Sequence, residues 1–193
     1  MSLRVEGLSK TFGEKTLFQN LNFEAAGPAV LWAPSGWGKT TLLRILMGLE
    51  TPDAGHVTGV GRVGAVFQED RLCPQLTAPE NVALVLPEGR GAGPALAADF
   101  ARLGMGPDTL NLPAGRLSGG QKRRAALLRA LWAEADTLLL DEPFTGLDPA
   151  AREEAAALLR EKCAGRPTLL ATHDQQAIQA LGWPVLELAK LCD

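Results

Sequence analysis

The sequence has 193 residues, 46% hydrophobic and 21% charged, which excludes a mainly disordered chain, a collagen-like repeat and a small disulfide scaffold. Its formal charge of −3 argues against a protein that coats nucleic acid, so we expect no nucleic-acid partner. The cysteines Cys73, Cys163 and Cys192 lack C-x-x-C spacing and predict reduced thiols in the cytoplasm without a metal cluster. The sequence shows no secretory signal and no apolar run of the roughly 18 residues that span a bilayer.

The predicted elements alternate between strands and helices along most of the chain. Apolar and polar residues alternate in 3–6 and 17–23, which predicts an antiparallel hairpin or meander. The later apolar runs are continuous and suit a parallel sheet that is covered on both faces. The predicted strands are 29–33, 64–68, 137–141, 168–172 and a weaker 184–188, and the predicted helices are 39 to about 49, 119 to about 135 and 149 to about 163. This order predicts an α/β fold with a mostly parallel sheet.

Residues 72–115 interrupt the alternation. They contain six prolines and a Gly-rich tract at 88–93, a composition that breaks long strands and long helices. We interpret 72–115 as a small helical subdomain, with the tract as a flexible loop inside it.

The string APSGWGKT, which begins at Ala33, lies between a predicted strand and a predicted helix. It follows the phosphate-binding pattern G-x-x-x-x-G-K-[ST], with Ala33 in place of the first glycine. Glycines let backbone N–H groups turn toward phosphates, while the lysine neutralises their charge and the threonine hydroxyl binds Mg²⁺. The structural alternative is an ordinary strand–helix turn with a surface lysine. The nucleotide-binding residues predicted here are Pro34, Ser35, Gly36, Trp37, Gly38, Lys39, Thr40 and Thr41.

A second motif, TLLLDEP at 137–143, is an apolar strand that ends in two adjacent carboxylates. Asp141 suits a position beside Mg²⁺, and Glu142 can orient and deprotonate the attacking water. The structural alternative is an acidic turn after a core strand. Together with the phosphate-binding loop, the motif predicts a nucleoside triphosphatase.

The string LSGGQ at 117–121 opens a predicted helix with Ser118 as its N-cap, 23 residues before Asp141. With the two preceding motifs in this order, almost the whole chain resembles the ATP-binding cassette (ABC) ATPases, and the string resembles their signature motif. The resemblance implies ATP and Mg²⁺ as ligands and one cassette domain over 1–193, with its signature helix beginning at Ser118. It implies that the signature residues Ser118, Gly119, Gly120 and Gln121 contact nucleotide.

The resemblance also implies roles for single residues. Phe12 is in the position of an aromatic that stacks on adenine, and Asp148 closes the string TGLD, which resembles the D-loop. Gln68 resembles the glutamine that senses Mg²⁺ and water, and His173 the histidine beside the γ-phosphate. Phe12, Gln68 and His173 each have a structural alternative, as core, strand-end cap or hydrogen-bonded histidine. The implied catalytic residues are Gln68, Glu142 and His173, and the implied Mg²⁺ residues are Thr40, Gln68 and Asp141.

In the family the signature motif of one cassette completes the ATP site of another, so the resemblance implies a second cassette, either a second copy of this chain in a homodimer, which we expect, or a different chain. Residues 71–82 resemble importer subunits of the nitrate, sulfonate and thiamine type, which implies docking to transmembrane permease subunits at the inner face of the cell membrane. A soluble ABC ATPase that acts as an assembly scaffold, for example for iron–sulfur clusters, is the alternative. The basic run 122–124 is interpreted as a solvated helix face.

Overall fold

The computed structural model describes residues 2–87 and 93–191, which form two β-sheets. A parallel sheet has the order β5-β6-β7-β3-β8, and an antiparallel sheet has the order β2-β1-β4. The parallel strands are β3 (Pro28–Trp32), β5 (Val63–Val66), β6 (Thr137–Asp141), β7 (Thr168–Thr172) and β8 (Val185–Glu187). The antiparallel strands are β1 (Leu3–Phe12), β2 (Lys15–Ala25) and β4 (Ala54–Thr58). The predicted α/β class, with an N-terminal antiparallel part, is confirmed.

Successive residues of the parallel strands enter two different hydrophobic cores. In β6, Leu138 and Leu140 belong to one core and Leu139 to the other, because side chains alternate across a strand. The core of Leu139 also contains residues of α1 (Lys39–Leu46) and of the antiparallel sheet. The core of Leu138 and Leu140 contains residues of α5 (Gly119–Trp132) and α6 (Pro149–Lys162). Both faces of the parallel sheet are therefore covered, as the apolar strands predict.

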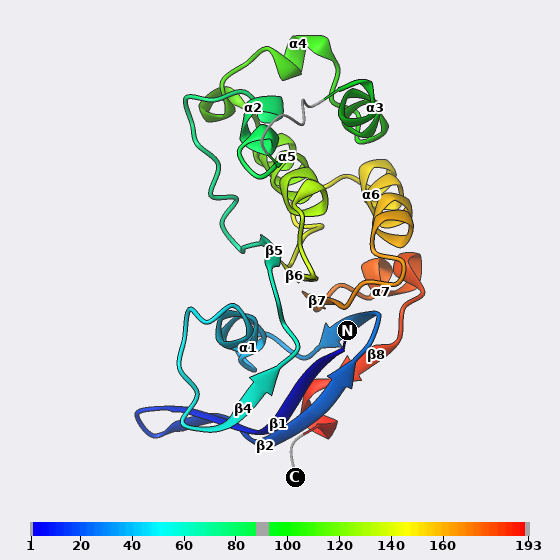
Figure 1. The fold of residues 1–193 in the computed structure, drawn as a ribbon. Helices are drawn as coiled ribbons and strands as arrows, with labels where there is room; N and C mark the ends of the chain where they lie inside the picture. Colours follow the sequence, from blue (N-terminus) through cyan, green and yellow to red (C-terminus); the bar gives the residue numbers. More distant parts are fainter. Residues whose placement is uncertain (1, 88–92, 192–193) are drawn as a thin grey trace.

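The helices α2, α3 and α4 extend the molecule away from the sheet. Figure 1 shows α2, α3 and α4 at one end and the antiparallel sheet at the other, with α5 and α6 between the helical end and the parallel sheet. The remaining helical elements are α2 (Ala78–Ala83), α3 (Pro94–Arg102), α4 (Pro107–Leu110), α7 (Gln175–Leu181) and the 3₁₀ turns Ala114–Arg116 and Leu188–Lys190. Short helices thus occupy the range 72–115, while residues 88–92 of the predicted flexible loop lie outside the described residues.

One strand, β4, and one helix outside 72–115, α7, were not predicted from the sequence. In β4 only Val57 is both apolar and half-buried, so the alternation that marks a strand is weak. In α7 only Ala177 and Leu181 are buried, and the helix depends on the N-cap Asp174, whose carboxylate accepts from the backbone of Gln176. Within the described residues, no helix combines the length and the apolar character needed to cross a membrane.

Candidate nucleotide-binding site

The candidate site lies where four neighbouring strands of the parallel sheet end. The phosphate-binding loop follows β3, Gln68 follows β5, Asp141 and Glu142 close β6, and His173 follows β7. Parallel strands bring their carboxyl ends to the same edge, so segments far apart in sequence meet there. Phe12 reaches the same place from the end of β1 in the antiparallel sheet.

The loop before α1 has the backbone geometry that phosphate binding requires. Gly36 and Gly38 have φ of 81° and 86°, a region that side chains with a Cβ rarely adopt. A Cβ on Gly38 would also lie 3.2 Å from the Leu17 side chain. The loop therefore turns directly into the N-terminus of α1, where backbone N–H groups and the helix dipole favour an anion.

Lys39 is the buried cation of this loop. Its ammonium donates to the carbonyl of Ala33 at 2.6 Å and to that of Pro34 at 3.3 Å. Burial lowers the pKa of Lys39, and the carboxylates of Glu142 and Asp141 oppose that effect. Ala33 contributes its carbonyl, so alanine at this position keeps the contact that holds the lysine.

The oxygen atoms of Thr40 and Asp141 fit a Mg²⁺ ion. Asp141 is 3% exposed, and burial raises its pKa, while a hydrogen bond from Thr40 opposes the increase. Because burial disfavours the charged form of this carboxylate, a divalent cation bound beside it would be stabilising. No cluster of three acidic, histidine or cysteine side chains occurs in the described part of the chain. A Mg²⁺ site does not require such a cluster, because one or two protein oxygens and the phosphates of a nucleotide can bind the ion together.

Glu142 is held in a strained position beside His173. Its φ of 47° lies in the left-handed region, which is costly for a residue with a side chain and is common at functional sites. Its carboxylate accepts from Thr172 Oγ1 at 2.8 Å and from His173 Nδ1 at 2.7 Å. These two donors, together with the strained backbone, fix the direction in which the carboxylate can accept a proton.

One cavity of about 680 Å³ joins these groups. Of the predicted residues, those that line it are Phe12, Ser35, Gly36, Gly38, Lys39, Thr40, Thr41, Gln68, Asp141, Glu142 and His173. Sequence reasoning missed Lys15, Leu17, Arg123 and Thr145, which also line it. Lys15 donates to the Gly36 carbonyl at 3.3 Å, but no motif marks it.

The signature residues lie away from this cavity. Among the described residues that line it, none comes from 118–121, and neither Pro34 nor the exposed Trp37 is among them. Ser118 caps α5 as expected, accepting from the backbone N–H of Gln121 at 3.3 Å. Gly120 packs so closely that a Cβ would lie 2.7 Å from the Gly146 carbonyl. Asp148 caps α6 through Ala151 N at 2.9 Å and pairs with Arg124 at 3.1 Å.

The interpretation of 122–124 as a solvated face is wrong for Arg123 and for Arg124, whose side chain is 14% exposed and donates to the Leu103 carbonyl. The Arg123 guanidinium donates to the carbonyls of Phe67 and Gln68, each at 2.6 Å, and pairs with Asp70 at 3.3 Å. Among the described residues, the carbonyls of Phe67 and Gln68 accept hydrogen bonds from Arg123 and not from a neighbouring strand. The predicted strand 64–68 therefore ends early, at Val66. Arg129 on the same helix donates to the carbonyls of Asp70 and Arg71. The helix that carries the signature therefore holds segment 67–71.

Comparisons with known proteins agree with this geometry. The model of the ABC transporter family matches residues 19–145. The aliphatic sulfonates import ATP-binding protein SsuB 1 of Nocardia farcinica is 43% identical over 90% of this chain and 72% of its own length. The Fe(3+) ions import ATP-binding protein FbpC 1 of Rhodococcus jostii is 37% identical, and the chain spans 56% of its length.

Solved structures give the same result. The ATP-binding cassette MJ0796, solved as a dimer in a post-hydrolysis state with ADP and Pi, matches with a TM-score of 0.80 and 27% identity. The match covers 92% of this chain and 90% of that one. The resemblance drawn from the motifs is confirmed, since the family model covers more than half of the sequence. The chain therefore belongs to the ABC transporter family and has the fold of its ATP-binding cassettes.

Proposed function

We propose that this chain is the ATP-hydrolysing subunit of an ABC importer. The observation that carries the proposal is the single cavity in which the loop lysine, the Thr40–Asp141 pair and the Glu142–His173 pair face one another. These groups supply the parts that phosphoryl transfer to water needs: phosphate positioning, a Mg²⁺ site and a base. The two relatives described above, SsuB 1 and FbpC 1, are named as import ATP-binding proteins, which favours this function over the assembly scaffold.

In the proposed reaction, Phe12 stacks on the adenine, and residues 34–41 surround the phosphates. Thr40, Asp141 and Gln68 would hold Mg²⁺, which would neutralise part of the phosphate charge. Glu142 accepts the proton of the attacking water, and His173 holds the Glu142 carboxylate and faces the γ-phosphate. Except for Pro34 and Trp37, the residues given these roles line the cavity.

We propose that a second copy of this chain completes the site. The N-terminus of α5, with Ser118, Gly119 and Gly120, lies outside the cavity of its own chain and can donate to the γ-phosphate of a partner's ATP. Gln121 completes the capping box, and Asp148 lies beside this surface through its pair with Arg124. ATP then stabilises the dimer because it contacts both surfaces, and hydrolysis weakens it.

An apolar groove offers a place for the permease. The groove, of about 380 Å³, lies between the end of α1, β5 and α2, and its rim carries Leu49 and Leu84, which are 51% and 60% exposed. Phe67 and Arg129 also line it, so the groove is continuous with segment 67–71. We propose that a short apolar cytoplasmic helix of the permease binds here, which places the chain at the inner face of the cell membrane.

Two experiments test these proposals. Lys39→Ala should abolish ATP binding in calorimetry, whereas Lys122→Ala, outside the cavity, should bind as the natural chain does. Equal binding by both variants would contradict the assignment of the cavity.

Leu84→Glu should release the chain from membranes that contain its permease without loss of ATP binding. Leu112→Glu, an equally apolar exposed residue elsewhere, is the matched control, and equal retention of both variants would contradict the docking groove.

A further inference from the structure

Phe12 has a cation beneath one face of its ring. The ammonium of Lys10 lies 4.8 Å from the centroid of the ring, within the range of a cation–π interaction. Lys10 and Phe12 are two residues apart at the end of β1, where the pairing of β1 with β2 is irregular. Lys10 is 7% exposed and Phe12 is 48% exposed, so the ammonium lies on the covered side of the ring.

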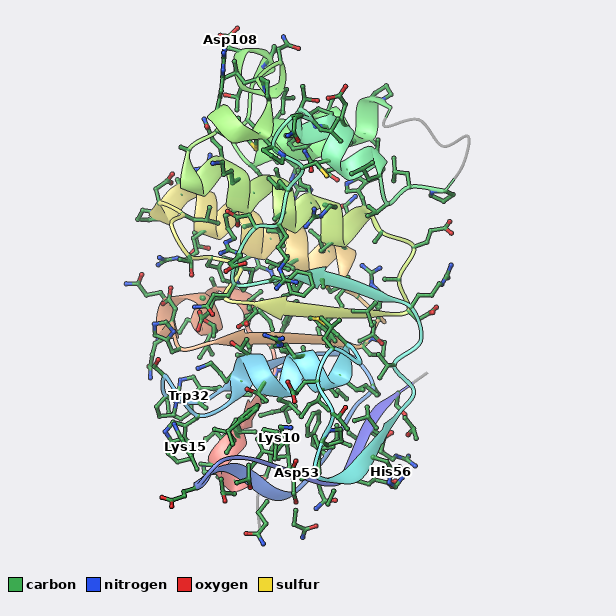
Figure 2. The ribbon with its side chains drawn as sticks, turned by 90° about the vertical axis from the view of Figure 1, so that its left-hand side faces the viewer. Lys10, Lys15, Trp32, Asp53, His56 and Asp108 are labelled. Carbon is green, nitrogen blue, oxygen red and sulfur yellow. The ribbon has the colours of Figure 1, made fainter. Side chains whose placement is uncertain are left out.

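The ammonium of Lys10 is fixed by three oxygen partners. It donates to the Thr51 carbonyl at 2.7 Å, and it pairs with Glu50 at 2.8 Å and with Asp53 at 3.6 Å. The hydrogen bond from Lys10 to Glu50 is the main cause that raises the pKa of the lysine, so the charge persists at neutral pH. Figure 2 shows Lys10 and Asp53 together between α1 and the antiparallel sheet.

The same segment binds the backbone around Lys10. Asp53 accepts from the Thr11 N–H at 2.7 Å, and the Asp53 N–H donates to the Ser9 carbonyl at 2.9 Å. Residues 50–53 follow α1, the helix that begins at the phosphate-binding loop. The end of β1 is thereby connected to the element that positions the phosphates. Phe12 itself lines the cavity together with Gly36 and Gly38.

We propose that Lys10 is a positioning residue for the nucleotide base. The ammonium fixes the orientation of the Phe12 ring from its covered side, so that the open face is available to a stacked purine. It also draws the π electrons of the ring toward the covered side. This inference rests on the proposed function, because it takes Phe12 as the surface on which adenine stacks. It adds to that function a buried residue that never touches the nucleotide.

The test separates binding of the base from binding of the phosphates. The probes are ADP and inorganic tripolyphosphate, which has no base, and both are titrated into the full chain by calorimetry with Mg²⁺ present. Lys10→Gln removes the charge and keeps a donor for the Thr51 carbonyl. We expect it to weaken ADP binding about fivefold, the order of one cation–π interaction, and to change tripolyphosphate binding less than twofold.

A double-mutant cycle distinguishes this role from a merely structural one. In a Phe12→Leu background, which keeps the apolar bulk but has no ring, Lys10→Gln should cause no further loss of ADP affinity. Lys10→Arg should retain most of the affinity because it keeps the charge. Glu50→Gln breaks the ion pair but leaves the cation, so it should also bind ADP nearly as the natural chain does.

Three results would overturn the inference. They are unchanged ADP binding by Lys10→Gln, an equal loss for ADP and tripolyphosphate, and a loss in the Phe12→Leu background as large as in the natural one. If Lys10→Gln does not fold, Lys10→Gln with Glu50→Gln removes both charges together and takes its place. A natural chain that binds neither probe would contradict the proposed function itself, whereas normal binding by every Lys10 variant would contradict only this inference.

Discussion

Replacing Arg123 with alanine measures how strongly α5 holds the segment that carries Gln68. The Arg123 side chain is 7% exposed and makes two hydrogen bonds of 2.6 Å to carbonyls, besides its ion pair with Asp70. The substitution leaves two carbonyls and one carboxylate without their cation. Removal of one partner from such a buried group costs about 3–5 kcal/mol, a large part of the ~5–15 kcal/mol by which domains are stable.

The assay is urea unfolding of the natural chain, Arg123→Ala, Arg123→Lys and Lys122→Ala. We expect Arg123→Lys to lose about half as much stability as the alanine variant, because one ammonium cannot reach both carbonyls with the geometry of a guanidinium. Lys122→Ala, on the same helix but partly exposed, should change stability by less than about 0.5 kcal/mol.

The same variants also test the connection to catalysis. Arg123 contacts the backbone of Gln68 but has no hydrogen bond to the phosphate-binding loop among the described contacts. We therefore expect Arg123→Lys to lower kcat for ATP about tenfold or more, with a smaller change in the Kd for ATP. A loss of stability below about 1 kcal/mol for Arg123→Ala, or a lysine variant with full kcat, would refute this reasoning.

Two further predictions concern close packing and burial. Gly120→Ala should destabilise the fold by about 1–3 kcal/mol in urea unfolding, because the added Cβ would meet the Gly146 carbonyl. Gly119→Ala is the control and should cause no loss of stability, because its Cβ would meet no atom within 4 Å. Equal effects of the two substitutions would contradict the close packing at Gly120. Burial raises the pKa of the Cys163 thiol from 9.0 to about 11, so the folded state holds the proton more tightly. The contribution of the protonated thiol to the free energy of unfolding should be fully present below pH 9 and be lost toward pH 11, a decrease of roughly 3 kcal/mol at most. Cys163→Ala should remove this part of the decrease. The same pH profile in the natural chain and in Cys163→Ala would contradict the prediction.

Local motifs allowed most of the residues that line the cavity to be predicted from the sequence. The phosphate-binding loop, Asp141 and Glu142 each lie next to a strand whose apolar run is unambiguous, so their position at the sheet edge follows from the strand itself. The strands 137–141 and 168–172 match β6 and β7 residue for residue. Ser118 as a helix cap was equally predictable, because capping depends on residues within one turn.

Contacts between distant segments were not predictable in this way. Arg123 is buried because segment 67–71, more than 50 residues earlier, packs on its helix, and no helical period of the sequence 119–132 shows that. Lys10 likewise finds its partners 40 residues away in the turn after α1. The weak strand β4 forms because β1 offers it an edge, which is a property of the sheet and not of residues 54–58.

We propose that one chain carries two halves of two different ATP sites. Analytical ultracentrifugation of Glu142→Gln tests it directly, because this variant should bind Mg²⁺-ATP and hydrolyse it poorly. With ATP it should sediment as a dimer of twice the 20.4 kDa chain, and without ATP as a monomer. Glu142→Gln combined with Ser118→Arg, which blocks the signature surface, should bind ATP and remain a monomer. A Glu142→Gln chain that binds ATP yet stays monomeric would contradict the shared site, and one that hydrolyses ATP at the natural rate would contradict the role of Glu142.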